Sequence, residues 1–186
     1  MPTYLALLRG INVGGRNKVA MADLRQLAES LGHGDVATYI QSGNLVFSSA
    51  EADTGALADA LEQGIADRLG VQSAVVVLSR AELARAIADN PFGSEPDPRR
   101  VHAVFRRDYH SPEAVRVVDQ LQQKSRAAGS ADEAVIVDRT LFLHTPDGYG
   151  RSDLAAQLFR SNAQAAGTAR NWATVTKLMA MLDAAR

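Results

Sequence analysis

Glycine, asparagine and basic residues gather in one loop near the start of the chain. Residues 9–18 read Arg-Gly-Ile-Asn-Val-Gly-Gly-Arg-Asn-Lys and follow a short apolar run. Glycines let the backbone come close to a bound group, and free amides beside Arg9, Arg16 and Lys18 could hold an anion. The spacing matches neither the dinucleotide fingerprint nor the phosphate loop, so a plain strand-to-helix connection with solvated charges is the alternative interpretation.

A second polar segment, Gln41-Ser42-Gly43-Asn44, stands between two runs of alternating apolar residues. Ser-Gly in that position is typical of a hairpin, and a turn alone explains these residue types. Ser42 is not in a nucleophile elbow, because the glycine two residues before it is missing. Hydrolase or transferase chemistry by Ser42 or Tyr39 would need a nearby base, and the sequence leaves this open.

A third polar segment, residues 167–178, contains the single tryptophan of the chain. Asn171 suits the N-cap of a helix, whereas Arg170 and Lys177 have no such structural explanation. A helix start beside Trp172 could bind an anion with an apolar or aromatic body, since amides and dipole attract the charge while the indole stacks. A tryptophan buried in the core is the alternative.

Hydrophobic periodicity predicts the elements that carry these segments. Short apolar or alternating runs predict four strands in the first part of the chain, at 3–8, 36–40, 45–47 and 75–78. Apolar stripes at helical spacing predict a helix around 24–31 and another around 57–69, capped by Asp53 or Thr54. The order βαββαβ is the split-βαβ or ferredoxin-like order, in which helices cover one face of an antiparallel sheet.

A second round follows a connecting helix and a linker. Ser79 and Glu82 form a capping box that predicts a helix from Arg80 to about Asp89. Strands and helices then follow in the order βαββα, the first round minus its last strand, and a C-terminal helix stands in place of that strand. We expect an α+β fold of two tandem ferredoxin-like plaits, divided into 1–78, a helix and linker at 79–100, and 101–186.

Composition excludes several classes of protein. With 46% hydrophobic and 22% charged residues, the chain can build a core and is neither disordered nor fibrous. A net charge of -1 gives no overall field for nucleic acid or membranes. The absence of cysteine and of metal-ligand spacing among the histidines predicts no disulfide, no metal site and no cofactor. No run suits a signal peptide or a membrane span, so we expect a soluble, cytoplasmic protein.

The three polar segments, together with their flanks, resemble the signature blocks of a bacterial family of unknown function, numbered 1697. They are the run from Tyr4 to Gly15, Thr38 to Asn44, and Thr168 to Leu178. The resemblance covers essentially the whole chain and implies tandem α/β plaits. It implies no activity and no catalytic residues.

The resemblance also gives a reason to group the three segments into one cation-rich site. Its members would be Arg9, Asn12, Lys18, Ser42, Asn44, Arg170, Asn171, Trp172 and Lys177. We expect this site to bind a small anionic ligand, such as a nucleotide or another phosphorylated metabolite. An RNA or single-stranded nucleic-acid module and an enzyme using the same site are the alternatives. The sequence leaves the oligomeric state and any catalytic residue open.

Overall fold

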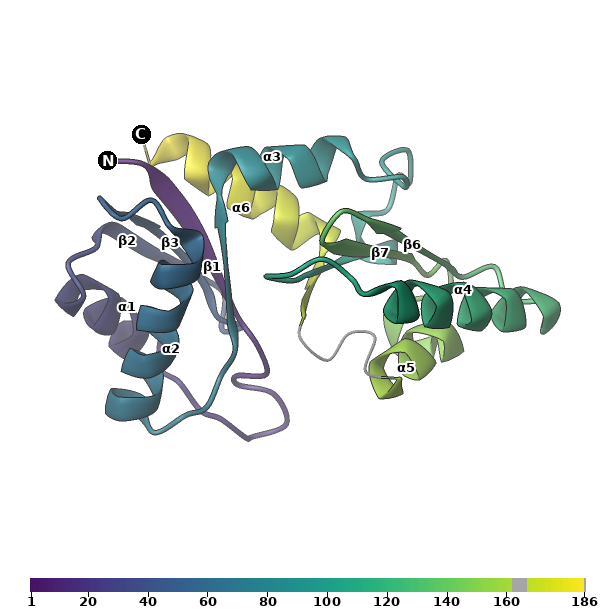
Figure 1. The fold of residues 1–186 in the computed structure, drawn as a ribbon, viewed down its shortest axis with the longest axis horizontal. Coiled ribbons are helices and arrows are strands. Elements are labelled where there is room, and N and C mark those ends of the chain that lie inside the picture. Colours follow the sequence, from purple (N-terminus) through teal and green to yellow (C-terminus); the bar gives the residue numbers. More distant parts are fainter. Residues whose placement is uncertain (162–166, 186) are drawn as a thin grey trace. The chain divides into compact units, whose positions relative to one another are not determined.

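The computed structural model describes residues 1–161 and 167–185. Its contacts divide the chain into two compact units, Met1–Arg85 with Lys177–Arg186, and Ala86–Thr176. Each unit contains one four-stranded antiparallel sheet with packed helices, and the chain ends in a C-terminal helix (Figure 1). The predicted α+β class and C-terminal helix are confirmed. The boundaries at residues 78 and 100 stay a prediction.

The sheet of the first unit has the strand order β2-β3-β1-β4. Its strands are β1 (Thr3–Leu8), β2 (Gly34–Tyr39), β3 (Asn44–Ser48) and β4 (Val75–Ser79). Alternate residues of β1, among them Tyr4, Ala6 and Leu8, join one core with the apolar stripes of α1 (Met21–Ser30) and α2 (Thr54–Leu69). Because side chains alternate along a strand, this pattern places both helices on the same face of the sheet.

Local signals decide where the helices of the first unit begin and end. Asp53 accepts hydrogen bonds from the first amides of α2, and Gly70 ends that helix in the left-handed conformation. Ser79 and Glu82 bond reciprocally at the start of α3 (Arg80–Ala88), which confirms the predicted capping box. The Arg80 guanidinium pairs with Asp183 of α6 (Trp172–Ala184), at 2.6 Å.

The second unit repeats this topology with the strand order β6-β7-β5-β8. Its strands are β5 (Val101–Phe105), β6 (Glu133–Val137), β7 (Thr140–His144) and β8 (Thr168–Asn171). The helices α4 (Pro112–Ala127) and α5 (Asp153–Arg160) begin after the N-caps Ser111 and Ser152, whose side chains accept from the first-turn amides. Two short 3₁₀ helices, η1 (Pro98–Arg100) and η2 (Tyr149–Arg151), precede β5 and α5. Both sheets therefore share one order of connections.

The prediction that the second round lacks its last strand is wrong. Residues 168–171 form β8, which pairs antiparallel with β5 from His102↔Asn171 to Phe105↔Thr168. This strand has four residues, and two of them are Arg170 and Asn171, so it lacks the apolar alternation by which strands are recognised. Residues 168–171 form a strand because their backbone pairs with β5, which lies more than sixty residues earlier in the chain.

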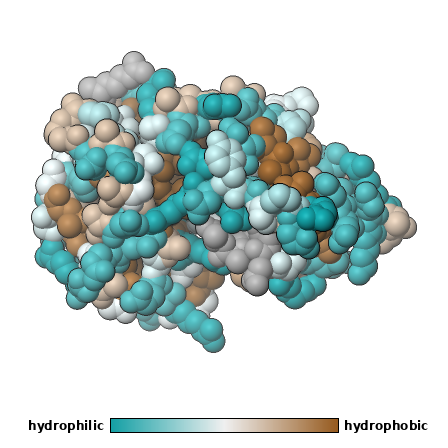
Figure 2. All heavy atoms as spheres, in the orientation of Figure 1, coloured by the Kyte–Doolittle hydropathy of each residue, from teal (hydrophilic) through white to brown (hydrophobic). Residues whose placement is uncertain are grey.

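Hydrophilic residues dominate the face drawn in Figure 2, and hydrophobic residues show there as separate small areas. Such scattered exposure is ordinary for a folded chain. Within the described residues, no helix is both long and apolar enough to cross a membrane.

A buried glutamine holds α4 to the start of β6. Gln122 is 7% exposed and lies on the same helix as the buried Val118. Its side-chain amide donates to the carbonyl of Asp132, and its side-chain oxygen accepts from the amide of Ala134. A polar residue on an apolar stripe thus satisfies two backbone groups where the strand begins.

We expect Gln122→Leu to destabilise the protein by about 2 kcal/mol, because the Ala134 amide and the Asp132 carbonyl would lose their partner. Urea unfolding measures this change. Gln120→Leu, at an exposed position of the same helix, is the matched control and should change the free energy of unfolding by less than about 0.5 kcal/mol. Equal effects of both changes would contradict this role of Gln122.

Candidate functional site

The Asn12 side chain fastens the glycine-rich loop, residues 9–18, to the hairpin tip, residues 41–44. Its Nδ2 donates to the carbonyls of Val19, at 2.9 Å, and Gln41, at 2.8 Å, and its Oδ1 accepts from the Val19 amide. The first two polar segments of the sequence therefore meet in the fold. Asn12, predicted as a ligand residue, uses both ends of its amide to build the site.

Gly43 and Asn44 bring the tip close to the end of β1. The Leu8 amide donates to the Gly43 carbonyl at 2.8 Å. Gly43 has φ +73°, and a Cβ added there would lie 2.7 Å from Leu8 Cβ and 2.8 Å from Ile11 Cδ1. Asn44 is fully buried, and its Nδ2 donates to the Tyr39 carbonyl and to Ser42 Oγ. Close packing at this point requires glycine.

The outer part of the loop folds back on itself. Gly14 and Gly15 both have positive φ, and the Arg16 amide donates to the Val13 carbonyl at 3.1 Å. Asn17, also left-handed, donates from Nδ2 to the Gly10 carbonyl. These bonds arrange the backbone before any ligand arrives, so that little ordering entropy would be lost on binding.

A hollow of about 440 Å³ lies between the loop and the tip. Its walls are formed by Asn12, Gly15, Lys18, Val19, Ala20 and Gln41. Ala20 is the N-cap of α1 and has no side-chain acceptor for the first helical amides. The positive end of the helix dipole and the exposed Lys18 therefore give this hollow a field that favours an anion. Asp23, in the first turn of α1, offsets part of that field.

The third predicted segment belongs to the second unit up to Thr176. Arg170 is 7% exposed, its Nη1 donates to Thr168 Oγ1 and the Ala169 carbonyl, and burial lowers its pKa to about 10. Asn171 accepts from the Ala173 amide, which confirms the predicted cap. Trp172 is half-buried and lies edge-on to Phe142, 6.1 Å between ring centres.

The fold thus brings two of the three predicted segments together. Ser42 and Asn44 stand in the tip and Asn12 and Lys18 in the loop, with the half-buried Arg9 at the end of β1. Convergence of this pair with the third segment stays a prediction. Lys177, exposed at the surface, is grouped with the first unit by its contacts.

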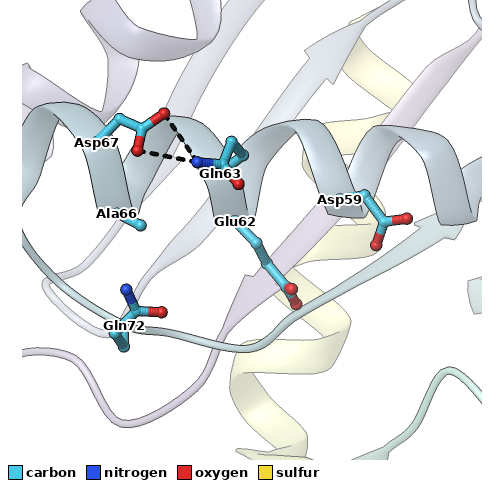
Figure 3. A pocket seen from close by; sticks show the side chains of 6 residues that line it. All are labelled: Asp59, Glu62, Gln63, Ala66, Asp67 and Gln72. Carbon is cyan, nitrogen blue, oxygen red and sulfur yellow. Dashed lines mark hydrogen bonds between the residues drawn. The ribbon is translucent and has the colours of Figure 1, made fainter.

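A second hollow of about 440 Å³ has the opposite electrostatic character (Figure 3). It is lined by Asp59, Glu62, Gln63, Ala66, Asp67 and Gln72. Glu62 accepts from the Val75 amide at 2.7 Å, and Gln63 donates to both oxygens of Asp67. Its carboxylates repel an anion, and the bond of Glu62 to Val75 joins α2 to the start of β4.

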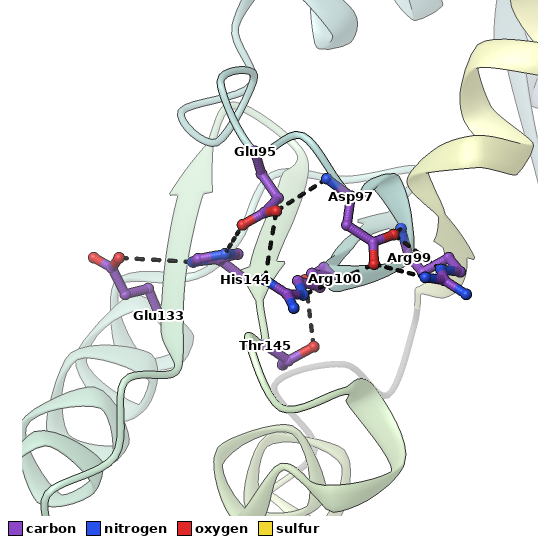
Figure 4. A network of polar contacts seen from close by, with 7 residues as sticks. All are labelled: Glu95, Asp97, Arg99, Arg100, Glu133, His144 and Thr145. Atoms are coloured by element: carbon purple, nitrogen blue, oxygen red, sulfur yellow. Dashed lines mark hydrogen bonds and ion pairs between the residues drawn. The ribbon is translucent and has the colours of Figure 1, made fainter.

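Sequence reasoning missed a carboxylate–imidazole network in the second unit (Figure 4). His144 Nε2 lies 2.7 Å from Glu95 Oε2, its Nδ1 lies 3.9 Å from Glu133, and its ring stacks on Phe92. A hydrogen bond from the Asp97 amide, followed by that from His144, holds the pKa of Glu95 below its ordinary value of 4.5. Glu95 and His144 are distant in sequence, so no local spacing signals their contact.

Among the described residues, 1–161 and 167–185, no three His, Asp or Glu side chains gather as a metal site would require. Burial lowers the pKa of His102 to about 4, and its ring packs on Tyr149. Burial, with the charge of Arg106, lowers the pKa of His110 to about 4 as well. At neutral pH both imidazoles are therefore uncharged and packed within their own unit.

Ile40, next to the hollow, has an unusual backbone conformation. Five non-glycine residues of the described chain have positive φ: Asn12, Asn17, Asp35, Ile40 and Asp138. Asparagine and aspartate tolerate this region, whereas a β-branched side chain is an outlier there, at a cost of about 1–2 kcal/mol. Ile40 has φ +49° and is 51% exposed, so burial returns little of that cost.

Residues 1–142 match the model of a family described as a protein of unknown function (DUF1697). The chain belongs to this family. The match spans the glycine-rich loop and the hairpin tip, whereas the third polar segment lies after it. The predicted family is thereby confirmed, over residues 1–142.

A solved structure extends the likeness of this DUF1697 protein to the whole chain. It is that of the conserved bacterial protein SP0830 from Streptococcus pneumoniae, with 27% sequence identity and a TM-score of 0.74. The alignment covers 97% of this chain and 98% of that protein. A search of curated proteins found no match.

In this DUF1697 protein, Gly43→Ala tests the close approach of the tip to the loop. We expect a loss of about 3 kcal/mol in the free energy of unfolding, from backbone strain plus overlap with Leu8 and Ile11. Gly14→Ala is the matched control, because Gly14 also has positive φ but faces open space. It should cost about 1 kcal/mol. Equal losses in chemical denaturation would show that packing at Gly43 is not tight.

The lowered pKa of Glu95 predicts an acid-dependent loss of stability. The stability that Glu95 contributes by accepting from the Asp97 amide and from His144 is fully present above the ordinary pKa of 4.5 and is lost as pH falls through the lower folded-state value. Melting temperatures between about pH 6 and pH 3 should fall less in Glu95→Gln than in the parent. Glu113→Gln changes an exposed position of the same unit, and its melting temperature should fall with pH as much as that of the parent. If the melting temperature of Glu95→Gln fell as much as that of the parent, Glu95 would not be the source of the acid-dependent loss of stability.

Proposed function

We propose that this protein binds a small anionic ligand, a nucleotide or another phosphorylated metabolite, in the hollow between the glycine-rich loop and the hairpin tip. The observation that carries the proposal is the composition of that hollow. It combines the exposed Lys18, loop backbone around Gly15, and the start of α1, whose N-cap Ala20 offers no side-chain acceptor. Backbone amides and a cation at a helix start suit a phosphate group.

The size and rigidity of the hollow support this function. A volume of about 440 Å³ lies within the range of about 300–1,000 Å³ that small-molecule pockets occupy. The bonds of Asn12 and Asn17 hold the loop in one shape. Because the hollow is open to water, its charges are screened, and we expect affinities near millimolar that weaken with salt.

The predicted site residues take two different roles in this proposal. Lys18 and Arg9 contribute positive charge, Asn12 joins the loop to the tip, and Asn44 holds the tip in shape through Tyr39 and Ser42. That Arg170, Asn171, Trp172 and Lys177 of the third segment also bind the ligand stays a prediction.

Contacts inside the second unit favour a small ligand over nucleic acid. Plait domains that bind RNA stack bases on exposed aromatic side chains of their central strands. On β7, the ring of Phe142 already lies against Trp172, and that of His144 stacks on Phe92. Both rings are therefore already packed against other aromatic rings of the same unit. We assign no catalytic residue, and we keep the cytoplasm as the proposed location because the chain has no cysteine.

A thermal-shift panel of nucleotides, sugar phosphates and inorganic phosphate, each at about 10 mM, tests the proposal. At least one member should raise the melting temperature of the parent, because a ligand that binds only the folded state stabilises it. In Lys18→Ala, the dissociation constant of that member should rise about fivefold, as expected for one exposed charge-assisted contact.

Lys124→Ala is the charge-matched control, since Lys124 is exposed on α4 of the second unit. It should bind the same ligand as tightly as the parent does. A panel without any stabilising member, or equal losses in both lysine variants, would remove the support for this hollow as an anion site.

A further inference from the structure

The second unit has a hollow of its own, which lies along one face of α5. Its volume of about 360 Å³ falls within the range of about 300–1,000 Å³ that small-molecule pockets occupy. We call it the α5 hollow, and its lining includes Tyr149, Ala155, Ala156, Phe159 and Arg160. These residues all belong to the second unit, so the hollow is formed within that unit alone.

The spacing of four residues along α5 creates this hollow. They stand at positions i, i+1, i+4 and i+5, which lie on one side of a helix, and they are Ala155, Ala156, Phe159 and Arg160. The two alanines leave room because their side chains are small, whereas the two larger side chains stand one turn further along the helix. The hollow therefore follows from the residue sizes in this part of the sequence.

Phe159 contributes little to the core of its unit. It is 65% exposed, whereas Leu154 and Leu158 of the same helix are fully buried. The four other phenylalanines of the chain are buried or half-buried. An exposed aromatic ring that also lines a hollow offers apolar surface to a bound molecule.

The Tyr149 ring forms a fixed and uncharged part of the lining. It is half-buried, packs against the core beneath α4 and α5, and has its ring centre 4.3 Å from that of His102. Burial raises the pKa of Tyr149 and lowers that of His102 to about 4, so both rings are neutral at pH 7. A ligand beside Tyr149 therefore meets an apolar surface that is already in place.

Arg160 supplies the lining with a cation. Its side chain is exposed, and no carboxylate within residues 1–161 and 167–185 pairs with it. Arginines of α4 differ in this respect, since Arg116 pairs with Glu113 and Arg126 pairs with Glu133. A guanidinium presents parallel N–H donors that match the two oxygens of a carboxylate. Arg160 can therefore pair with an anionic group of a molecule in the hollow.

We propose that the α5 hollow binds a small aromatic carboxylate, whose ring lies against Phe159 and Tyr149 while its carboxylate pairs with Arg160. The lining suits a single negative charge, because Arg160 is the one charged side chain among the described residues that form it. The Ser152 hydroxyl, which caps α5, already accepts from the Ala155 amide. The site belongs to a different unit from the proposed anion hollow, so this inference does not depend on the proposed function.

Isothermal titration of the full chain with 2-naphthoate and with the uncharged 2-naphthamide tests the inference. The parent should bind 2-naphthoate with a dissociation constant of about 1 mM, and about fivefold more tightly than 2-naphthamide, because one exposed ion pair adds a modest gain. In Arg160→Gln this difference should fall below about twofold, while the affinity for 2-naphthamide stays at the parent value. Lys124→Gln removes an exposed charge on α4 and is the matched control, which should keep the full difference.

Filling the hollow provides a test that does not depend on charge. Ala156→Leu should weaken the binding of both probes by at least about tenfold, because leucine would take the space of the aromatic ring. Gln157→Leu introduces the same side chain on the same helix outside the lining and should bind both probes like the parent. Both positions are half-buried and leucine favours helices, so both melting temperatures should stay within about 3 °C of the parent.

Phe159→Ala distinguishes a ligand contact from a structural role. The affinity for both probes should fall about fivefold, because each loses apolar contact with the ring. The melting temperature should stay within about 2 °C of the parent, since the ring is 65% exposed. Tyr109→Ala, at a position that is 69% exposed in the same unit, is the matched control and should bind both probes like the parent.

Several results would overturn the inference. They are the absence of binding of either probe by the parent at about 10 mM, equal binding of the two probes by the parent, parent-like binding by Ala156→Leu, and a fall of more than about 5 °C in the melting temperature of Phe159→Ala. Lys18→Ala should bind 2-naphthoate like the parent, and weaker binding by this variant would assign the probe to the hollow of the first unit instead. The phosphate panel tests that first hollow, so the proposed function stands or fails separately.

Discussion

The candidate site depends on the three hydrogen bonds of one side chain, Asn12. They join the glycine-rich loop to Val19, just before α1, and to Gln41 in the hairpin tip. The backbone of Asn12 is in the left-handed conformation, which asparagine tolerates better than most residues. Its backbone and its side chain therefore both help to shape the loop. Without these bonds the backbone groups of Val19 and Gln41 would lose their partner, and the walls of the hollow would not be held at their present spacing.

In the second unit, other residues join the loop after the first strand to the hairpin tip. There the tip residue Arg139 donates from its side chain to the carbonyl of Arg107, in the loop that follows β5. In the first unit the loop donates to the tip, and in the second the tip donates to the loop. Both units fasten this loop, because the end of the first strand lies beside the hairpin tip at the same end of each sheet. Ile40 and Asp138 each follow the first strand of their hairpin and both have left-handed backbone, but the first connection has four residues and the second has two.

Polar residues that attract notice in a sequence do not all contact ligands. Asn44 and Arg170 are buried and bonded to nearby atoms of their own unit, as Asn12 is bonded to the tip. Burying such groups is costly unless they find partners, so a buried polar side chain first has to be explained by the structure that it holds. The groups left for a ligand are the more exposed ones, namely Lys18, the loop backbone and the start of α1.

The sequence alone determined the order of strands and helices in the first unit, the caps at Asp53 and Ser79, and the α+β class, because periodicity and capping depend on residues that are near neighbours in the chain. It also pointed to two polar segments that the fold brings together. Tertiary structure decided that residues 168–171 form a strand, since their partner is β5, and that Glu95 meets His144. It likewise gave Ile40 its left-handed backbone, which its residue type disfavours. Each of these depends on groups that are distant along the chain or on a turn whose geometry two paired strands impose, and no local pattern contains that information.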